Sequence, residues 1–179
     1  MKKILLATIL SVLPFVANAK DIDAKPVIGG DFSYIKTDLQ SELDGVVENQ
    51  YSSFSGIIGI KINDEFGLEA FYQQSLDEKS LGIITTNFNA FGFDALAYIP
   101  LEENLYLIPS FGMARYKVVA DINGYGSNNE DGLGIRTGIG FQININENVG
   151  LRISGRYVHL DIESVDDIME LSTGLRFSF

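Results

Sequence analysis

The sequence contains no cysteine, and this absence limits how the protein can hold itself together. Without cysteine the chain forms no disulfide bond and no cysteine-rich metal site. A protein of 179 residues without such links needs either a large core or a closed sheet. Because domains commonly contain about 100 to 200 residues, we expect a single domain.

Positive charge is also scarce. The chain has 13 lysine and arginine residues against 24 acidic residues, which gives a formal net charge of −11. Proteins that bind nucleic acid carry stripes of lysine and arginine, and no such stripe occurs here, so we exclude nucleic acid as a partner. An excess of acid is typical of exposed, solvated loops.

Apolar runs long enough to span a membrane as a helix are missing as well, and the longest run lies at the N-terminus. Two lysines precede the apolar residues 4–16, and a small-residue Ala-Asn-Ala sequence follows them. This order predicts an export signal over residues 1–19, cleaved before Lys20, and a mature domain over residues 20–179. The run is too short for a helical membrane anchor. Removal of the signal takes away two lysines and no acidic residue, so the mature chain has 11 basic against 24 acidic residues, a net charge of −13.

What the sequence does contain is a repeated alternation of apolar and polar side chains. Near the C-terminus, large apolar residues occupy almost every second position from Met169 to Phe179. A period of two predicts a β-strand with unlike faces and not a helix. The pattern recurs along the chain and predicts eight strands, over residues 28–36, 54–62, 66–73, 91–99, 107–114, 135–142, 149–157 and 169–179.

The connections between these strands alternate in length. Short turns are predicted at residues 63–65, 100–104 and 144–148. Longer loops are predicted at residues 38–52, 75–82, 117–131 and 161–167. Short turns on one rim and long loops on the other are typical of outer-membrane barrels. The predicted fold is therefore all-β, an eight-stranded antiparallel transmembrane up-and-down β-barrel with both termini on the periplasmic side.

The two faces of the predicted strands differ in composition, but periodicity alone does not say which face points inward. One face carries large apolar residues. The other carries glycine, serine and nine charged residues, namely Asp31, Lys61, Glu69, Asp94, Arg136, Arg152, Arg156, Glu170 and Arg176. A soluble barrel turns its apolar face inward, whereas a membrane barrel turns it outward. The mixture of small residues and nearly balanced charges suits a narrow lumen in which buried charges must pair, so we predict that the apolar face contacts lipid.

Aromatic residues support the same orientation, because they gather towards the ends of the predicted strands. Such positions are typical of the interfacial girdles of membrane barrels. The residues concerned are Tyr34, Phe54, Phe66, Tyr72, Phe141, Tyr157 and Phe179.

Two segments resemble the small outer-membrane barrels of the OmpA/OmpX and opacity-protein type. The terminal Leu-Arg-Phe-Ser-Phe sequence of residues 175–179 is similar to the C-terminal assembly signal of that family, and residues 107–114 are similar to its P-x-x-G strand. The resemblance covers the whole mature chain. It implies a place in the outer membrane of a Gram-negative bacterium, recognition of Phe179 by the outer-membrane insertion machinery, and escort by periplasmic chaperones. Members act as adhesins, surface antigens, structural proteins or, rarely, enzymes, so the resemblance leaves the role open.

The single histidine, His159, is the one candidate for a catalytic base. Asp161 and Glu163 share its face of the predicted strand, and Ser164 follows. Lipid A deacylases of similar barrel shape place a serine two positions after such a histidine, but Asp161 occupies that position here. The missing nucleophile indicates an interfacial histidine at the rim, and we predict no catalytic residue.

Metal and cofactor sites are not predicted either. The longer loops hold several acids, but their spacing is not that of a calcium loop. The acids are Glu42, Asp44, Glu48, Asp77, Glu78, Glu130, Asp131, Asp166 and Asp167. These acids could bind divalent cations that bridge them to lipopolysaccharide phosphates. The simpler interpretation is that they form a solvated loop surface. The glycine-containing segment 124–129 lacks the lysine and the serine or threonine of a phosphate-binding loop.

These features together predict a non-enzymatic surface protein with a structural or adhesion role. It would contact outer-membrane lipids and lipopolysaccharide, and it would meet a host or surface ligand through loops 38–52 and 117–131. The alternatives are a small porin-like channel lined by the lumenal charges and a lipid-A-modifying enzyme. An eight-stranded barrel is just wide enough for side chains to fill, which favours a filled lumen over a pore.

Overall fold

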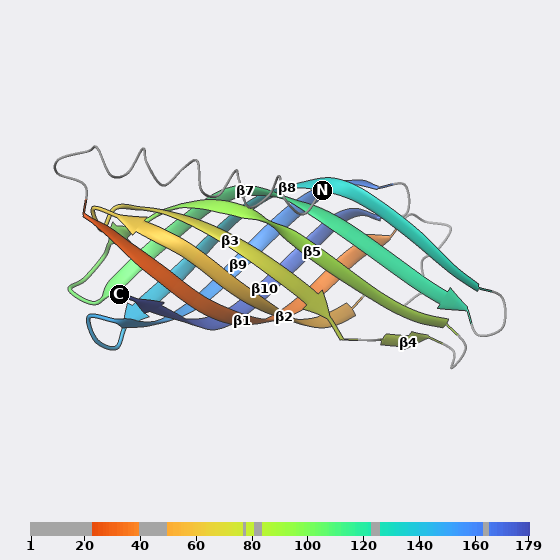
Figure 1. The fold of residues 1–179 in the computed structure, drawn as a ribbon, viewed down its shortest axis with the longest axis horizontal. Helices are drawn as coiled ribbons and strands as arrows, with labels where there is room; N and C mark the ends of the chain where they lie inside the picture. The colour runs from red at the N-terminus through yellow and green to blue at the C-terminus, as the bar shows by residue number, and fades with distance from the viewer. Residues whose placement is uncertain (1–22, 40–49, 77, 81–83, 123–125, 163–164) are drawn as a thin grey trace, which may run out of the picture.

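The computed structural model is built from β-strands that wrap into an elongated barrel (Figure 1). It describes residues 23–39, 50–76, 78–80, 84–122, 126–162 and 165–179. The predicted signal over residues 1–19 and its cleavage site lie outside the described residues, as does most of the predicted loop 38–52. Within the described ranges, no helix is long and apolar enough to cross a membrane.

The described residues form ten strands of one sheet. They are β1 (Ala24–Leu39), β2 (Gln50–Ile62), β3 (Phe66–Ser75), β4 (Glu78–Ser80), β5 (Ile84–Ala97), β6 (Ile99–Pro100), β7 (Leu105–Ile122), β8 (Gly126–Asn144), β9 (Val149–Ile162) and β10 (Val165–Ser178). The eight long strands form the wall, and the short β4 and β6 add one pairing each, to β5 and β7. All pairings are antiparallel.

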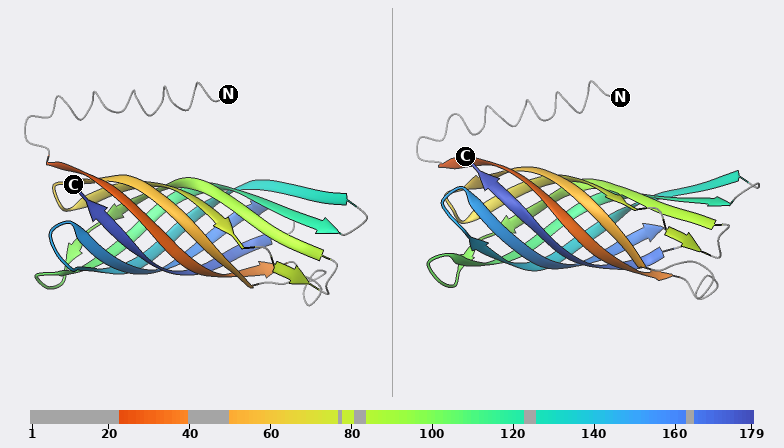
Figure 2. Two further views of the ribbon diagram at one scale, coloured as in Figure 1. Left: turned by 60° about the horizontal axis from the view of Figure 1, so that its bottom comes forward. Right: turned by 90° about the horizontal axis from the view of Figure 1, so that it is seen from below.

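The wall closes on itself. β1 pairs with both β2 and β10, and β5 pairs with both β3 and β7, so every long strand has two neighbours. Figure 2 shows the closed, tilted arrangement from two further sides. Closure satisfies the backbone N–H and C=O groups within the sheet, which hydrocarbon surroundings require because they offer no alternative partner. The predicted eight-stranded antiparallel barrel is confirmed.

The short turns and the chain ends share one rim. The β2–β3 turn places Asn63 and Asp64 at φ values of 50° and 56°, a backbone conformation that these two residue types tolerate well. The backbone N–H of Phe179 donates to Pro26 O at 3.1 Å, and that of Ser178 donates to Asn148 O in the β8–β9 turn at 2.8 Å. The end of β10 therefore lies beside both the start of β1 and a short turn, as predicted.

The long-loop rim differs from the prediction. Residues 117–131 were expected to form a loop, but the β7–β8 ladder continues from the pair Lys117↔Asp131 to the pair Ile122↔Gly126. β5 likewise begins at Ile84, seven residues before the predicted strand. The prediction was wrong because it tracked apolar alternation, whereas the hydrogen bonds of a ladder continue through polar residues once they leave the membrane.

Burial follows the alternation along each strand. The residues of β3 are exposed and buried in strict turn from Phe66 to Ser75. The outer surface carries exposed phenylalanine, isoleucine, leucine and tyrosine, including all seven aromatic residues predicted to form girdles. All nine charged residues predicted to face the lumen are buried, each with 9% or less of its surface exposed. Apolar side chains thus face outward and charged ones inward, as expected for a wall that stands in lipid.

Candidate functional site: the barrel interior and the extracellular rim

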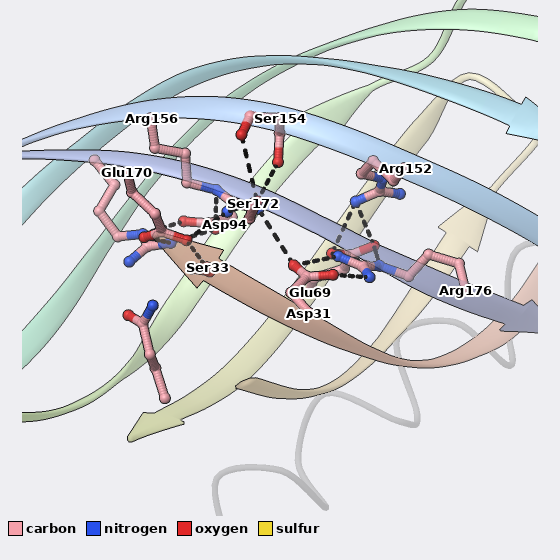
Figure 3. Close-up of polar contacts among 12 residues, drawn as sticks. Asp31, Ser33, Glu69, Asp94, Arg152, Ser154, Arg156, Glu170, Ser172 and Arg176 are labelled. Atoms are coloured by element: carbon pink, nitrogen blue, oxygen red, sulfur yellow. Dashed lines mark hydrogen bonds and ion pairs between the residues drawn. The ribbon is translucent and has the colours of Figure 1, made fainter. Parts of the chain in front are cut away.

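Arg176 of β10 lies between two acidic side chains from other strands (Figure 3). Its guanidinium donates to Asp31 of β1 at 2.6 and 3.0 Å and to Glu69 of β3 at 3.2 to 3.4 Å. Glu69 also accepts two hydrogen bonds of 3.0 Å from Arg152 of β9. Because three strands separate β3 from β9 in either direction around the wall, Glu69 ties together two opposite sides of the barrel.

A second group of charges lies nearer the extracellular end. Arg156 of β9 donates to Glu170 and to Ser172 of β10, each at 3.0 Å. Arg136 of β8 donates to Asp94 of β5 at 3.1 and 3.4 Å. Each guanidinium therefore has a carboxylate within hydrogen-bonding distance, as a buried charge requires.

The two groups form one balanced network. Longer ion pairs join them, such as Arg156 to Asp31 at 3.9 Å. Four arginines stand against four carboxylates: Arg136, Arg152, Arg156 and Arg176 against Asp31, Glu69, Asp94 and Glu170. The interior thus pairs its charges across the lumen, where a low dielectric strengthens attraction but makes an unpaired ion costly.

Apolar layers cover the network on both sides, and sequence reasoning missed them. Towards the periplasm, Leu96, Tyr98 and Ile108 form a buried cluster with Tyr106 packed against it. Towards the outside lies a larger cluster, made of Ile35, Tyr51, Ile57, Phe71, Phe88, Ala90, Ala114, Tyr116, Val158, Leu160 and Ile168. The lumen is therefore layered as apolar, charged and apolar.

Aromatic side chains join these layers to the charges. The hydroxyl of Tyr98 accepts a hydrogen bond from Arg152 at 3.0 Å, and that of Tyr116 accepts one from Arg136 at 2.6 Å. The Arg136 guanidinium also lies 4.0 Å from the centre of the Phe71 ring, a cation–π contact. The sequence did carry a signal for these inward-facing aromatic residues. Phe71, Tyr98 and Tyr116 occupy the same alternate positions along their strands as the lumenal charges.

Glycines give the network its space. Gly112 lies beside Asp94, and Gly174 lies beside Asp31, so closely that a Cβ at either glycine would overlap the neighbouring carboxylate. The registers Asp94↔Gly112 and Asp31↔Gly174 create both contacts. This close approach explains why the polar face of the strands is rich in glycine.

A lysine lies at the periplasmic end of the lumen. Lys61 lies 4.7 Å from the ring centre of Tyr98 and 5.3 Å from that of Tyr106, and its Nζ lies 2.9 Å from Asp64 in the β2–β3 turn. The hydrogen bond from Lys61, with a second from Lys25, lowers the pKa of Asp64 from its usual value. Lys61 thus fills the space below the apolar layer.

Little free space remains at the centre of the network. A cavity with a volume of about 10 Å³ lies at the centre of the network, bordered by Asp31, Glu69, Asp94, Arg136 and Arg156. That volume is about the minimum that one water needs. The described side chains therefore fill the lumen at the level of the charges.

His159 is placed at the rim, as predicted, and its side chain contacts Asp167 of the neighbouring strand. Its Nδ1 lies 2.9 Å from Asp167 Oδ1 on β10, directly across the register pair His159↔Asp167. A hydrogen bond from Tyr157 and a second from His159 lower the pKa of Asp167. Asp161, which was predicted to share the face of His159, is also exposed, farther along β9. Glu163 and Ser164 lie outside the described residues.

Charged residues at this rim also lie on the β7–β8 ribbon, the antiparallel pair formed by residues 115–122 and 126–133. Arg115 and Asp131 form an ion pair on its outer surface, and Lys117 is exposed. Among the residues that the structure describes, no group of three or more histidine, aspartate and glutamate side chains is arranged to hold a metal ion.

The comparisons with known proteins match this geometry. The family model described as "Outer membrane protein beta-barrel domain" matches residues 4–179. A search of curated proteins found no match.

Among solved structures, Neisserial surface protein A is 17% identical with a TM-score of 0.74, and the alignment covers 88% of this chain and 99% of that one. Ail, the attachment invasion locus protein of Yersinia pestis, is 20% identical with a TM-score of 0.61, covering 87% and 97%. The N-terminal β-barrel domain of Pseudomonas aeruginosa OprF is 15% identical with a TM-score of 0.56, covering 84% and 97%. At these identities the likeness shows the fold alone.

Proposed function

This chain belongs to the outer membrane protein beta-barrel domain family, and we propose that it is a non-enzymatic surface protein whose sealed barrel presents an adhesive extracellular end. The family implies the outer membrane of a Gram-negative bacterium. A filled lumen and a contact surface outside the cell are the two parts of the proposal.

The layered lumen is the observation that carries the first part. A balanced charge network crosses the barrel between two apolar clusters, and the cavity inside it has room for about one water. Such a lumen offers no continuous aqueous path at the level of the charges. A filled interior also makes the wall rigid, and rigid scaffolds are where binding segments are usually displayed.

The β7–β8 ribbon supports the second part. Its ladder runs to the pair Ile122↔Gly126, whereas the first described pair between β8 and β9 is Gly134↔Leu160. The ribbon therefore extends past β9 on one side, while on the other side β5 stays paired with β7 up to Ile84↔Ile122, so β5, β7 and β8 project together, as Figure 1 shows. Two proteins of the same fold are named as a surface protein and as an attachment invasion locus protein, which is consistent with a role in attachment.

A non-enzymatic role is part of the proposal because of the surroundings of His159. Its hydrogen bond goes to Asp167, and within the described ranges no serine hydroxyl is found hydrogen-bonded to it. A histidine and a carboxylate without a nucleophile are insufficient for covalent hydrolysis.

Export and assembly complete the proposal. We infer that a signal over residues 1–19 is removed before Lys20, that periplasmic chaperones carry the chain, and that the insertion machinery recognises β10. Phe179 at the end of this strand has an exposed side chain, with 69% of its surface accessible.

The filled lumen predicts that the protein conducts no ions in planar lipid bilayers. Single-channel recording on the purified, folded protein is expected to show no steady openings, because the charge network and both apolar layers lie across the path. Reproducible openings of one size would contradict the proposal and favour a porin-like channel.

The contact role predicts that bacteria carrying the protein bind host-cell surfaces more strongly than bacteria with the empty vector. Replacing residues 118–130 by an Asn-Gly turn keeps the β7–β8 ladder in register, removes the β7 partners of residues 84–88 of β5, and should reduce this binding to the vector level. The matched control replaces the periplasmic turn 101–104 in the same way and should retain binding. Equal binding by the shortened variant and the control would remove the ribbon as the contact surface.

A further inference from the structure

A groove runs along the outer surface of the barrel where β8, β9, β10 and β1 adjoin. It has a volume of about 690 Å³, and its walls include Tyr34, Ile139, Tyr157, Met169 and Leu171. The groove is shallow and widely open, and it is not an enclosed pocket. These side chains belong to the face that contacts lipid, so the groove is open to the membrane.

A glycine forms the floor of the groove. Gly155 of β9 pairs with Leu171 on one side and Ile139 on the other, and a Cβ built on it would meet no atom within 4 Å. The groove is therefore shaped by a missing side chain between large neighbours. A larger residue at this position would fill the space without displacing any part of the wall.

The extracellular end of the groove is polar and carries a cation. Lys36 lines both the groove and an adjoining depression of about 130 Å³, which it shares with Tyr157 and Asp167. Lys36 is exposed, and the structure gives it no ion pair among the described residues. Asp167 is engaged in its own cluster by hydrogen bonds from Tyr157 and His159.

The location of the groove points to the outer leaflet. Lys36 precedes the end of β1 at Leu39, and Met169 follows the start of β10 at Val165, so both lie near the long-loop rim. At that depth an apolar groove that ends in a lysine matches an amphiphile with an acyl chain and a phosphate. In the outer leaflet of a Gram-negative outer membrane, the abundant lipid of this chemistry is lipid A.

We propose that this groove binds one acyl chain of a lipid A molecule over Gly155, while Lys36 contacts one of its phosphates. Close packing against the groove walls holds the chain, since hydrophobic transfer offers little gain between two apolar surroundings. Lys36 favours a lipid that carries a phosphate, because its ammonium group and the phosphate have opposite charges. The rest of the mature protein is strongly negative and offers phosphate little attraction. The inference rests on the membrane orientation in the proposed function but not on adhesion.

The chain offers a matched pair of variants as a test. Gly56 also faces outward with no atom within 4 Å of a built Cβ, but it does not line the groove. We therefore compare Gly155→Leu with Gly56→Leu, and both with Lys36→Gln. Heat-dependent gel mobility confirms that each variant is folded. Native mass spectrometry from detergent micelles then measures retention of added lipid A, of its monophosphoryl form and of phosphatidylglycerol.

The wild type and Gly56→Leu are expected to retain one lipid A, and Gly155→Leu to retain at least tenfold less. Lys36→Gln should weaken retention of lipid A severalfold, and the wild type should also retain the monophosphoryl form, which keeps one phosphate. Equal retention by Gly155→Leu and Gly56→Leu would overturn the site. Equal retention of phosphatidylglycerol by the wild type would overturn the assignment to lipid A, and a protein dimer lost in Gly155→Leu would assign the groove to a second copy.

The lipid-binding experiment and the conductance experiment test separate proposals, the groove and the filled lumen, and either proposal can be wrong without the other. Gly155 lies on the outside of the wall, so Gly155→Leu is expected to leave the lumen closed in planar bilayers. If Gly155→Leu loses lipid binding but still conducts no ions, the lipid site is tested without any change in the filled lumen of the proposed function.

Discussion

Glu69→Ala is expected to lower the free energy of unfolding in lipid vesicles by about 3 to 5 kcal/mol, the usual cost of removing one partner from a buried ion pair. Glu69 accepts hydrogen bonds from Arg152 at 3.0 Å and from Arg176 at 3.2 to 3.4 Å. The substitution leaves two buried guanidinium groups with less compensating charge. Urea titration followed by gel mobility of the folded form measures the change.

Two variants control for other effects of the Glu69 substitution. Glu69→Gln keeps the side-chain length and some hydrogen bonds but removes the charge, so its effect should fall between those of the wild type and alanine. Glu65→Ala, in the exposed β2–β3 turn, should stay within about 0.5 kcal/mol of the wild type. If Glu69→Ala were as stable as Glu65→Ala, the charge network would not stabilise the barrel.

Phe111→Arg is expected to destabilise the barrel by about 2 to 4 kcal/mol, the range for a cation on the lipid face near the middle of the membrane. Phe111 lies on β7, six residues after the strand begins at Leu105, and 57% of its surface is exposed. In lipid that exposure is favourable for a phenyl ring and costly for a guanidinium. The same urea titration measures the effect.

The depth dependence of this cost provides its control. Leu133 also faces outward, but it precedes Gly134, the first residue of β8 that pairs with β9, and so lies near the extracellular rim. Leu133→Arg should therefore cost no more than about 1 kcal/mol. Phe111→Ala separates the loss of the ring from the gain of charge. Equal effects of arginine at both positions would argue against a membrane around the barrel wall.

The strands and the orientation of their faces could be predicted from sequence because a period of two determines which residues share a side. The nine charged residues fell on one phase of the alternation, and all nine are buried. The balance of charge then decided which phase faced inward, since a lumen must pair its ions and a water-facing surface need not.

Strand register could not be predicted from the alternation, and so the cross-strand partner of His159 could not be predicted either. Asp161 shares an exposed face with His159, as predicted, but residues two apart along a strand are farther from each other than a directly opposed cross-strand pair. The register His159↔Asp167 is a property of the assembled sheet. The extension of the β7–β8 ladder was missed for a different reason, because polar residues that pair through their backbones show no apolar alternation in the sequence.

The inner apolar layers were missed because the prediction treated the lumenal face as uniformly polar. Phe71, Tyr98 and Tyr116 share the phase of the charges, yet each packs in or beside an apolar cluster. A residue's phase indicates which way it points, but its neighbours depend on the height that strand tilt and register give it. The groove over Gly155 was unpredictable for the same reason, since strands β8, β9, β10 and β1 all contribute to it.

The central claim is that the apolar face of the wall contacts lipid around a sealed interior, and tryptophan fluorescence tests it most directly because the chain has no tryptophan of its own. Phe111→Trp places one fluorophore on the outer face, and Phe88→Trp places one in the lumen, where Phe88 is 4% exposed. In vesicles, brominated lipid tails should quench Phe111→Trp strongly and Phe88→Trp more weakly, and aqueous iodide should quench neither. Strong iodide quenching of Phe111→Trp, with no effect of brominated lipid, would contradict the account.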